Sequence, residues 1–412
     1  MKPEEAVDVV EDVGTGTPCY VYDGDAIAER AEEYVEAASK AFPGRSVVCY
    51  AVKANFNPGV LETVLEVTRA ADAVSLWEAK LAGSLGAETI VLNGNAKSRE
   101  ELSTAVREGW IINVDSAEEL DTLERIARRE DTEAKAALRV NPEVDPETHP
   151  HIATAVKGSK FGVPLDEAED VCRRMIESEH IEFLGLHYHI GSQITDLDPF
   201  VQALESVADF LRDTGLLEEI SYLNVGGGLG VRYTDEDPPS PGELLETLSP
   251  VLRELYDESS GFDLYLEPGR SVVAEAGMLV TEVRLVKRSG GRTWIFVDAG
   301  MNALIRPVLY DAEHRVVFPG AEGDTVEASV AGPLCESGDV LAEDVPAPEG
   351  LEPGDKAVFM TAGAYCESMA SNYNCQPLPA SITVKSGRPV HVRRVQAYDV
   401  FLGCWSGEEG GP

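Results

Sequence analysis

The sequence is short of lysine and of long apolar runs. Only 11 of its 34 basic residues are lysines, and they stand against 73 acidic residues, which gives a formal net charge of −39. Because so acidic a surface repels polyanions, we expect no nucleic acid and no anionic membrane surface as a partner. No apolar segment approaches the roughly 20 residues that a membrane-spanning helix requires.

Paired cysteines and a signal peptide are also lacking. The seven cysteines are scattered singly, without a Cys-x-x-Cys pair. This pattern argues against a disulfide framework and against a zinc site, so no metal is expected. The amino-terminal stretch MKPEEAVDVVEDVG is acidic and has neither the basic start nor the apolar core of a signal peptide. Together these features predict a cytoplasmic protein.

Acidic residues are spread along the whole chain, as in AERAEEYVEAA, DEAEDVC and YTDEDPPSPGELLE. This distribution resembles the surfaces of proteins from salt-loving microbes, where salt screens the repulsion between like charges. We therefore interpret the acidity as an adaptation to a halophilic habitat and not as part of the function.

Eight short apolar runs alternate with amphipathic helical segments. One such segment is AEELDTLERIARRE, whose Leu120, Leu123 and Ile126 share one face. Strands that alternate with helices in this way predict an α/β fold, specifically a (β/α)8 barrel of the TIM type. The predicted strands are residues 47–52, 72–77, 89–94, 110–116, 137–142, 183–192, 222–228 and 263–270.

After the eighth run the residue pattern changes. Segments of alternating apolar and polar residues are separated by turns that contain glycine and proline, which predicts a carboxy-terminal β domain. The early run Cys19–Asp23 is a candidate strand of the same sheet. We therefore expect residues 1–30 to contribute to the β domain, residues 31–274 to form the barrel, and residues 275–412 to complete the β domain.

Chemically capable residues follow several of the predicted strands. Lys53 ends the first, HYHIGSQ the sixth, NVGGGLG the seventh and LEPGR the eighth. Active sites of such barrels lie at the carboxyl ends of the strands, so these groups are expected to meet. The plain alternative for a lone lysine is that Lys53 marks where a strand reaches the surface.

The glycines of the seventh run can form a phosphate-binding turn. Gly226, Gly227 and Gly228 allow a tight turn with exposed N–H groups, and the Ser192 hydroxyl can add a further donor. Three glycines alone are more often only a turn. Their place after a barrel strand is what favours phosphate.

A carboxylate and an amine complete this pattern. Glu267 precedes Pro268 at a strand end, and a buried carboxylate needs a partner such as a protonated pyridine nitrogen. Lys53 can form a Schiff base with the same cofactor. A phosphate cradle, a Schiff-base lysine and a pyridinium carboxylate together indicate pyridoxal 5'-phosphate. His189 is then placed to stack on its ring, or it is simply a polar residue of the barrel mouth.

The motifs YAVKAN, HIGSQ, GGG and EPGRS resemble those of the barrel-type pyridoxal-phosphate decarboxylases, the fold III family that contains the ornithine and diaminopimelate enzymes. VDAGMNALIRPVLYDAEH, GPLCESGDVLA and GAYCESMASNYN in the β domain resemble the diaminopimelate branch. The resemblance implies an alanine-racemase-like architecture and a homodimer. It also implies that Lys53 and the EPGR glycine, Gly269, bind the cofactor, that Tyr365 reaches its phosphate, and that Cys335 of the partner subunit donates a proton.

The family's contacts for meso-2,6-diaminopimelate also match residues of this chain. A second amino-acid head presents a carboxylate that the planar fork of an arginine can bind, and Arg270 and Arg306 are candidates. Either arginine could instead serve the cofactor's phosphate. Tyr310, Glu336 and Tyr365 complete the candidate substrate set, with Glu336 taking the distal ammonium. The implied reaction is decarboxylation to L-lysine and CO2.

The sequence departs from the family pattern at three places near these motifs. Bulky Trp77 stands where small residues are usual, Glu367 replaces a small or apolar residue, and CQPLPAS follows SNYN in place of a basic stretch. Related decarboxylases that act on carboxynorspermidine, ornithine or lysine remain alternatives. So do an alanine-racemase-like enzyme, against which Glu267 argues, and a regulatory homologue without catalysis, against which Lys53 and Cys335 argue.

Overall fold

The eight predicted runs are the eight strands of a closed parallel barrel. In the computed structural model, which describes residues 1–144, 158–321 and 323–403, these strands follow the order β2-β3-β4-β5-β6-β8-β9-β10, and pairing of β10 with β2 closes the ring. The barrel prediction is therefore confirmed. The strands are β2 (Ser46–Ala51), β3 (Ala70–Ala73), β4 (Thr89–Leu92), β5 (Ile111–Val114), β6 (Ala134–Asn141), β8 (Ile181–His187), β9 (Tyr222–Asn224) and β10 (Asp263–Leu266), and the short β7 (Val163–Pro164) pairs with β6.

Several predicted strands extended too far at their carboxyl ends, which changes where site residues lie. The second strand ends at Ala73, and the Ser75 hydroxyl accepts the Glu78 N–H to begin α4, so Trp77 lies in a first helical turn and not in a strand. The sixth strand ends at His187 and not at Ser192. The apolar runs continued past the strands because the turns that follow them are also buried.

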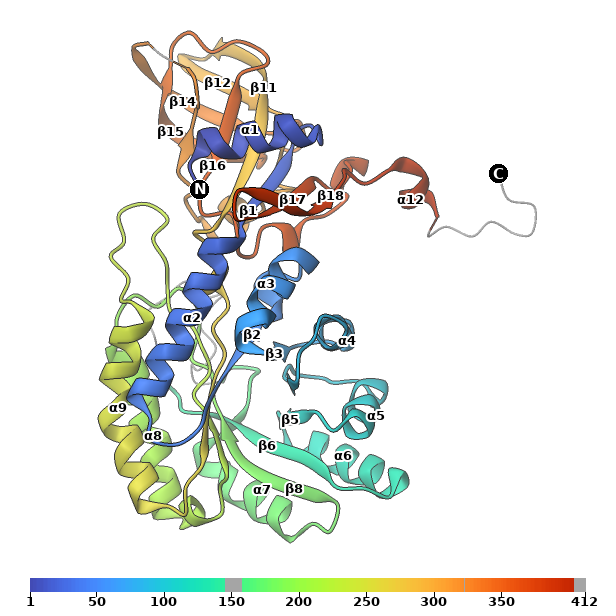
Figure 1. Ribbon diagram of the computed structural model, residues 1–412, viewed down its shortest axis with the longest axis vertical. Helices are drawn as coiled ribbons and strands as arrows, with labels where there is room; N and C mark the ends of the chain where they lie inside the picture. The colour runs from blue at the N-terminus through green and yellow to red at the C-terminus, as the bar shows by residue number, and fades with distance from the viewer. Residues whose placement is uncertain (145–157, 322, 404–412) are drawn as a thin grey trace, which may run out of the picture. The chain divides into compact units, whose positions relative to one another are not determined.

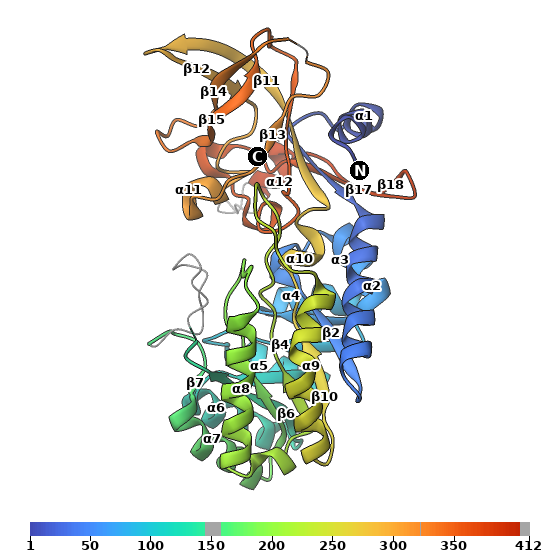
Figure 2. The same ribbon diagram turned by 90° about the vertical axis from the view of Figure 1, so that its left-hand side faces the viewer.

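Helices surround the barrel strands, and α8 and α9 lie side by side (Figures 1 and 2). Side-chain caps explain several starts: Asn57, Ser98, Ser116 and Ser240 each accept a backbone N–H from the first turn. The helices are α2 (Gly24–Ala41), α3 (Pro58–Thr68), α4 (Leu76–Ser84), α5 (Arg99–Glu108), α6 (Ala117–Glu130), α7 (Leu165–Glu177), α8 (Asp198–Asp213), α9 (Pro241–Glu258) and α10 (Arg270–Val273), with 3-10 turns η1 (Val52–Ala54) and η2 (Leu216–Glu218).

The chain divides into two compact units. The barrel unit comprises Ile27–Val231 and Glu236–Val272, and the β unit comprises Met1–Ala26, Arg232–Asp235 and Val273–Pro412. The β unit is built on a mixed sheet in the order β15-β14-β12-β11-β1-β17-β18, in which β16 also pairs with β11 and β13 pairs with β16.

The amino-terminal run joins this sheet as expected, because β1 pairs with both β11 and β17. The first half of the long strand β11 pairs with β1 and β16, and its second half pairs with β12. The elements of this unit are α1 (Pro3–Val13), β1 (Cys19–Asp23), β11 (Gly277–Ser289), β12 (Arg292–Val297), α11 (Arg306–Tyr310), β13 (Val316–Val317), β14 (Thr325–Ala331), β15 (Val340–Pro348), β16 (Lys356–Phe359), η3 (Glu367–Met369), η4 (Tyr373–Cys375), β17 (Ala380–Lys385), β18 (Arg388–Arg393) and α12 (Tyr398–Leu402).

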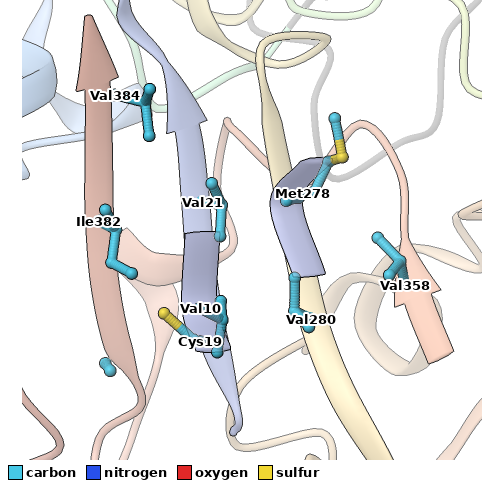
Figure 3. Packing of buried hydrophobic residues seen from close by; sticks show 10 residues of the cluster. Val10, Cys19, Val21, Met278, Val280, Val358, Ile382 and Val384 are labelled. Carbon is cyan, nitrogen blue, oxygen red and sulfur yellow. The ribbon is translucent and has the colours of Figure 1, made fainter. Parts of the chain in front are cut away.

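The β unit has its own apolar core. Figure 3 shows Cys19 and Val21 of β1 between Ile382 of β17 and Val280 of β11. Val10 of α1, a helix that the sequence analysis did not predict, packs on the same cluster. Burial of these side chains stabilises the sheet by removing apolar surface from water. Within the described part of the chain, no helix has the length and apolar character needed to cross a membrane.

Candidate active site

Lys53 lies in the turn η1, directly after β2, at the carboxyl end of the barrel. Its Nζ is 3.6 Å from Oδ2 of Asp72, which follows in β3 and is fully buried. The Lys53 side chain itself is 36% exposed. The lysine therefore presents a reachable amine above a buried carboxylate, which is the geometry expected of a group that reacts with a ligand.

Glu267 lies at the centre of a buried polar network. Its Oε1 accepts hydrogen bonds from the side-chain amides of Asn93 and Asn224, each at 2.7 Å. Its Oε2 is 3.1 Å from Nε2 of His187. All four residues are buried, and they come from the ends of β4, β8, β9 and β10. Three donors thus hold one carboxylate where an unpaired charge would cost several kcal/mol.

The network continues across the barrel through further amides. Asn93 also donates to Oδ1 of Asp72 at 2.6 Å, and Asn113 donates to Oδ1 of Asn93 at 2.8 Å. The Asn224 amide donates to the Tyr222 hydroxyl at 2.7 Å. Since each asparagine amide both donates and accepts hydrogen bonds, the side chains fix one another and hold the two carboxylates in place.

The two buried carboxylates have opposite pKa shifts. Burial alone would raise the pKa of Glu267, but the hydrogen bond from His187 and the charge of Lys53 act against burial and lower that pKa below its usual range. Burial, with the charge of Glu267 added, raises the pKa of Asp72 to about 7, although Lys53 opposes this rise. Glu267 is therefore the carboxylate that remains ionised at neutral pH.

Both histidines of the sixth strand region are held neutral by their surroundings. Burial lowers the pKa of His187 and lowers the pKa of His189 further, and Lys53 contributes to the shift at His189. Nδ1 of His189 is 3.1 Å from the Gly227 N–H and accepts its hydrogen bond, so this ring carries its proton on Nε2. The His189 ring is therefore fixed beside the glycine turn and carries no charge.

The three glycines are required by close backbone packing. A Cβ on Gly227 would lie 2.1 Å from the Glu267 carbonyl oxygen, one on Gly226 would lie 2.4 Å from that of Tyr188, and one on Gly228 would lie 2.5 Å from that of Gly191. No side chain can be accommodated at these three positions, so close backbone packing alone requires glycine there.

The turn offers fewer free donors than its sequence suggested. The Gly226 N–H donates to Oδ1 of Asn224 and the Gly227 N–H donates to His189. Of the three glycines, Gly228 alone has an N–H with no acceptor among the described residues.

Ser192 and Arg270 provide the remaining anion-binding groups of the barrel unit. Nε and Nη2 of Arg270 donate to the Ser192 hydroxyl at 3.2 and 3.0 Å, and Arg270 is buried. A buried guanidinium beside a hydroxyl and a glycine N–H fits a phosphate monoester. The residues of the barrel unit thus fit pyridoxal 5'-phosphate, and the contact favours the phosphate role for Arg270 over binding of a substrate carboxylate.

Gly269 lets the eighth strand end pass close to the lysine turn. A Cβ at this position would lie 3.0 Å from that of Ala51, the last residue of β2, and 3.1 Å from that of Ala54, the last residue of η1, so the contact is made on either side of Lys53. The Ala51 N–H donates to the Pro268 carbonyl in the same contact. Gly269 therefore sets the position of Lys53 relative to Glu267.

In the β unit, Arg306 is a buried cation held by neutral groups. Its guanidinium lies 4.3 Å from the centre of the Tyr233 ring, and Nη1 is 2.8 Å from Nε2 of His314. Because arginine only donates, His314 accepts on Nε2, and its Nδ1–H donates to the Met360 carbonyl at 3.0 Å. Arg306 is 4% exposed, its Nε lacks a hydrogen-bond partner, and no carboxylate among the described residues pairs with it.

Cys335 and Glu336 lie on a tight exposed loop that Asp339 organises. The Asp339 carboxylate accepts the N–H groups of Leu334 at 2.8 Å and Met301 at 2.6 Å. A Cβ on Gly300 or Gly332 would come within 2.6 and 2.4 Å of this carboxylate, so both positions need glycine. The loop therefore has a fixed base from which it presents a thiol and a carboxylate.

The two candidate tyrosines occupy constrained backbone. Tyr310 ends α11, one helical turn after Arg306. Tyr365 has a left-handed φ of 56° and lies between buried Ala364 and Cys366. The neighbouring Gly363 packs so tightly that a Cβ would lie 1.8 Å from the Val273 carbonyl oxygen.

The departures from the family pattern lie in different surroundings. Trp77 is 85% exposed. Glu367 is buried, accepts from the Tyr22 hydroxyl and pairs with Arg393 at 2.9 Å, so the acid is neutralised within the β unit. Cys375, which begins CQPLPAS, is an exposed residue of η4.

Sequence reasoning missed the residues that support the site: Asp72, His187, Asn93, Asn113 and Asn224 in the barrel, and Tyr233, His314 and Asp339 in the β unit. A signal for the barrel group was present. A polar residue interrupts the apolar run near the end of each of these strands, as in AADA, LNG, INV, LHYH and LNV. For the β unit group we find no comparable pattern.

Comparisons with known proteins agree with this geometry. Residues 28–274 match the family described as pyridoxal-dependent decarboxylase, pyridoxal binding domain. The chain is 42% identical to the diaminopimelate decarboxylase of Aquifex aeolicus over 94% of this chain and 91% of that protein. It is 40% identical to that of Archaeoglobus fulgidus over 96% and 94% of the two chains. The structure of diaminopimelate decarboxylase from Helicobacter pylori complexed with L-lysine superimposes with a TM-score of 0.89 at 34% identity, covering 96% of this chain and 98% of that one.

The raised pKa of Asp72 predicts a pH-dependent stability. Because the folded carboxyl has a pKa of about 7 against an ordinary 3.8, the folded state binds more protons than the unfolded state between these values, so stability falls as pH rises through this window. Asp72→Asn removes the titration. Cofactor-free Asp72→Asn should match the wild type near pH 4 and exceed it by up to about 4 kcal/mol at pH 8.

Urea unfolding of both proteins between pH 4 and pH 8 measures this difference. Asp209→Asn, at an exposed position of α8, is the matched control and should show no such trend. A stability difference for Asp72→Asn that stays constant with pH would contradict the assignment.

Proposed function

Because the chain belongs to the diaminopimelate decarboxylases, a branch of the pyridoxal-dependent decarboxylase family, we propose that it converts meso-2,6-diaminopimelate to L-lysine and CO2 with pyridoxal 5'-phosphate as cofactor. The observation that carries the chemistry is the reachable amine of Lys53 beside buried Asp72, at the same end of the barrel as the buried, ionised Glu267. The reaction is a step of lysine biosynthesis.

The barrel residues hold the cofactor and set its charge. Bound pyridoxal 5'-phosphate supplies an electron sink for the carbanion that remains when CO2 leaves. Lys53 Nζ provides the covalent attachment, Ser192, Arg270 and the Gly228 N–H bind phosphate, and His189 stacks on the ring. Glu267 keeps a proton on the pyridine nitrogen, because its low pKa favours the carboxylate and thus an ion pair with that nitrogen.

The β-unit residues select the substrate and return a proton. Arg306 binds the distal carboxylate, a role supported by a buried guanidinium without a carboxylate of its own. Tyr310 lies near this group on α11, Glu336 binds the distal ammonium, and Tyr365 contributes to phosphate and substrate binding. Cys335 Sγ gives its proton to the α-carbon, which yields L-lysine.

We also propose an oligomeric state and a cellular environment for the enzyme. The enzyme acts as a homodimer in which Cys335 of the partner subunit serves each Lys53, and it works in the cytoplasm of a halophilic organism. The exposed loop that carries Cys335 and Glu336 supports the first part, because exposure leaves both side chains available to a second chain. The net charge of −39, spread along the chain, supports the second.

Lys53→Ala should abolish both the visible absorbance of bound cofactor and turnover, because the covalent attachment is lost. The measurement is the absorbance spectrum together with borohydride trapping of cofactor on the protein. Lys80→Ala, at an exposed position of α4, is the control and should retain both. Cofactor that borohydride still fixes to Lys53→Ala would assign the attachment to another lysine.

Selectivity tests the role of Arg306. The wild type should use meso-diaminopimelate better than L-lysine by a factor on the order of 10⁴, because lysine leaves the buried guanidinium unpaired. Arg306→Lys should lower kcat/KM for diaminopimelate sharply and leave cofactor absorbance unchanged, since a point charge does not reproduce the fork. Arg288→Lys, on the exposed part of β11, is the control. Equal turnover of the two amino acids by the wild type would contradict the assignment of diaminopimelate as substrate, while the assignment as a decarboxylase would stand.

Subunit mixing tests the shared site. Neither Lys53→Ala nor Cys335→Ala should be active alone, but after exchange about half of the dimers are hybrids with one intact site, so activity should recover to about a quarter of the wild type. Each variant exchanged with itself is the control. Absence of recovery after exchange has been verified by mass spectrometry would show that Lys53 and Cys335 act within one chain.

A further inference from the structure

Two exposed cysteines lie on adjoining segments of the β unit. Among the described cysteines, only Cys335 and Cys375 are exposed, whereas Cys19, Cys49, Cys172 and Cys366 are buried. The loop of Cys335 is already assigned to catalysis above. Cys375 has no role in that mechanism, and it belongs to the CQPLPAS segment that departs from the family pattern.

Side-chain hydrogen bonds join the two segments next to the cysteines. The Cys335 N–H donates to Oδ1 of Asn374 at 2.9 Å, and the Tyr373 hydroxyl donates to Oε2 of Glu336 at 3.3 Å. Cys375 follows Asn374 directly, with its Cα about 3.8 Å along the chain. One side chain and one peptide unit therefore connect the two cysteines, and a disulfide requires the η4 turn to bring their Cα atoms to a separation of about 4.4–6.8 Å.

The backbone on the Cys375 side is under local strain. Asn374 and Cys375 have left-handed φ values of 53° and 56°, which non-glycine residues adopt at a cost. Both belong to the short exposed turn η4, where few buried contacts oppose a change of conformation. Movement of this turn toward the Cys335 loop, which Asp339 holds fixed, therefore meets little resistance.

We propose that Cys335 and Cys375 form a reversible disulfide that switches the enzyme off under oxidising conditions and shields the catalytic sulfur from irreversible oxidation. Hydrogen peroxide oxidises the Cys335 sulfur to a sulfenic acid and is itself reduced to water. The Cys375 sulfur then attacks the sulfenic sulfur, a second water leaves, and the S–S bond forms. A dithiol reductant returns both thiols.

The effect on activity follows from the proton that Cys335 supplies, so this part rests on the proposed function. A disulfide sulfur has no proton to give to the α-carbon. General acid catalysis contributes a factor on the order of 10² or more, so oxidised enzyme should lose activity by about 100-fold. Reduction should restore the rate.

Peptide mapping of peroxide-treated holoenzyme tests the pairing directly. After free thiols are blocked and the protein is digested without reductant, a peptide pair joined through Cys335 and Cys375 should appear as activity falls, and it should disappear with dithiothreitol as activity returns. Absence of that pair, or pairing of either cysteine with any other, overturns the proposal.

Cys375→Ser separates protection from simple oxidation. Its basal activity should equal that of the wild type, but its inactivation by peroxide should resist dithiothreitol, because an unprotected sulfenic acid proceeds to sulfinic acid. Cys172→Ser, at a buried position of α7, should behave as the wild type. Equal recovery of Cys375→Ser and wild type would overturn the protective role. Pairing without loss of activity would contradict the proton-donor role of Cys335 in the proposed function, while the disulfide itself would stand.

Discussion

The structure of the barrel site depends on keeping one carboxylate ionised in a buried position. Glu267 is 4% exposed and receives its hydrogen bonds from two asparagine amides and one histidine. Neutral donors stabilise the charge without neutralising it, so its negative potential remains available to a positive ring nitrogen. This arrangement explains why amides project inward from several strands, where apolar side chains would otherwise fill the barrel.

The β unit contains a buried charge of the opposite sign, the guanidinium of Arg306. Arg306 is held by the ring face of Tyr233 and by one histidine nitrogen, and both interactions leave its charge uncompensated. In the reaction proposed above, the carboxylate of meso-diaminopimelate that is not lost as CO2 would supply the missing anion, and L-lysine keeps that carboxylate. Each unit therefore contains one buried charge held by neutral neighbours, an anion in the barrel unit and a cation in the β unit.

Most of the fold could be predicted from the sequence, because the spacing of apolar residues and the positions of turn residues reflect local backbone preferences. All eight barrel strands were recognisable as apolar runs, and Cys19–Asp23 was recognisable as a strand of the second sheet. Strand ends were less predictable: Leu76 and Trp77 looked like strand residues until the Ser75 cap showed a helix start. Helix α1 was not predicted, because its apolar residues form only a short stripe beside an acidic face. The roles of the supporting side chains could not be predicted, since the pairing of Asn93 with Glu267, or of His314 with Arg306, depends on contacts between distant parts of the sequence.

Turnover of the Glu267→Gln variant saturated with cofactor tests whether an ionised carboxylate at this position makes the bound cofactor an effective electron sink. Glutamine has the same shape and cannot hold the ring-nitrogen proton. With Glu182→Gln, an exposed position at the opposite end of the barrel, as control, we expect cofactor absorbance to persist while kcat for meso-diaminopimelate falls by about 100-fold or more. A Glu267→Gln enzyme that binds cofactor and turns over at the wild-type rate would contradict this expectation.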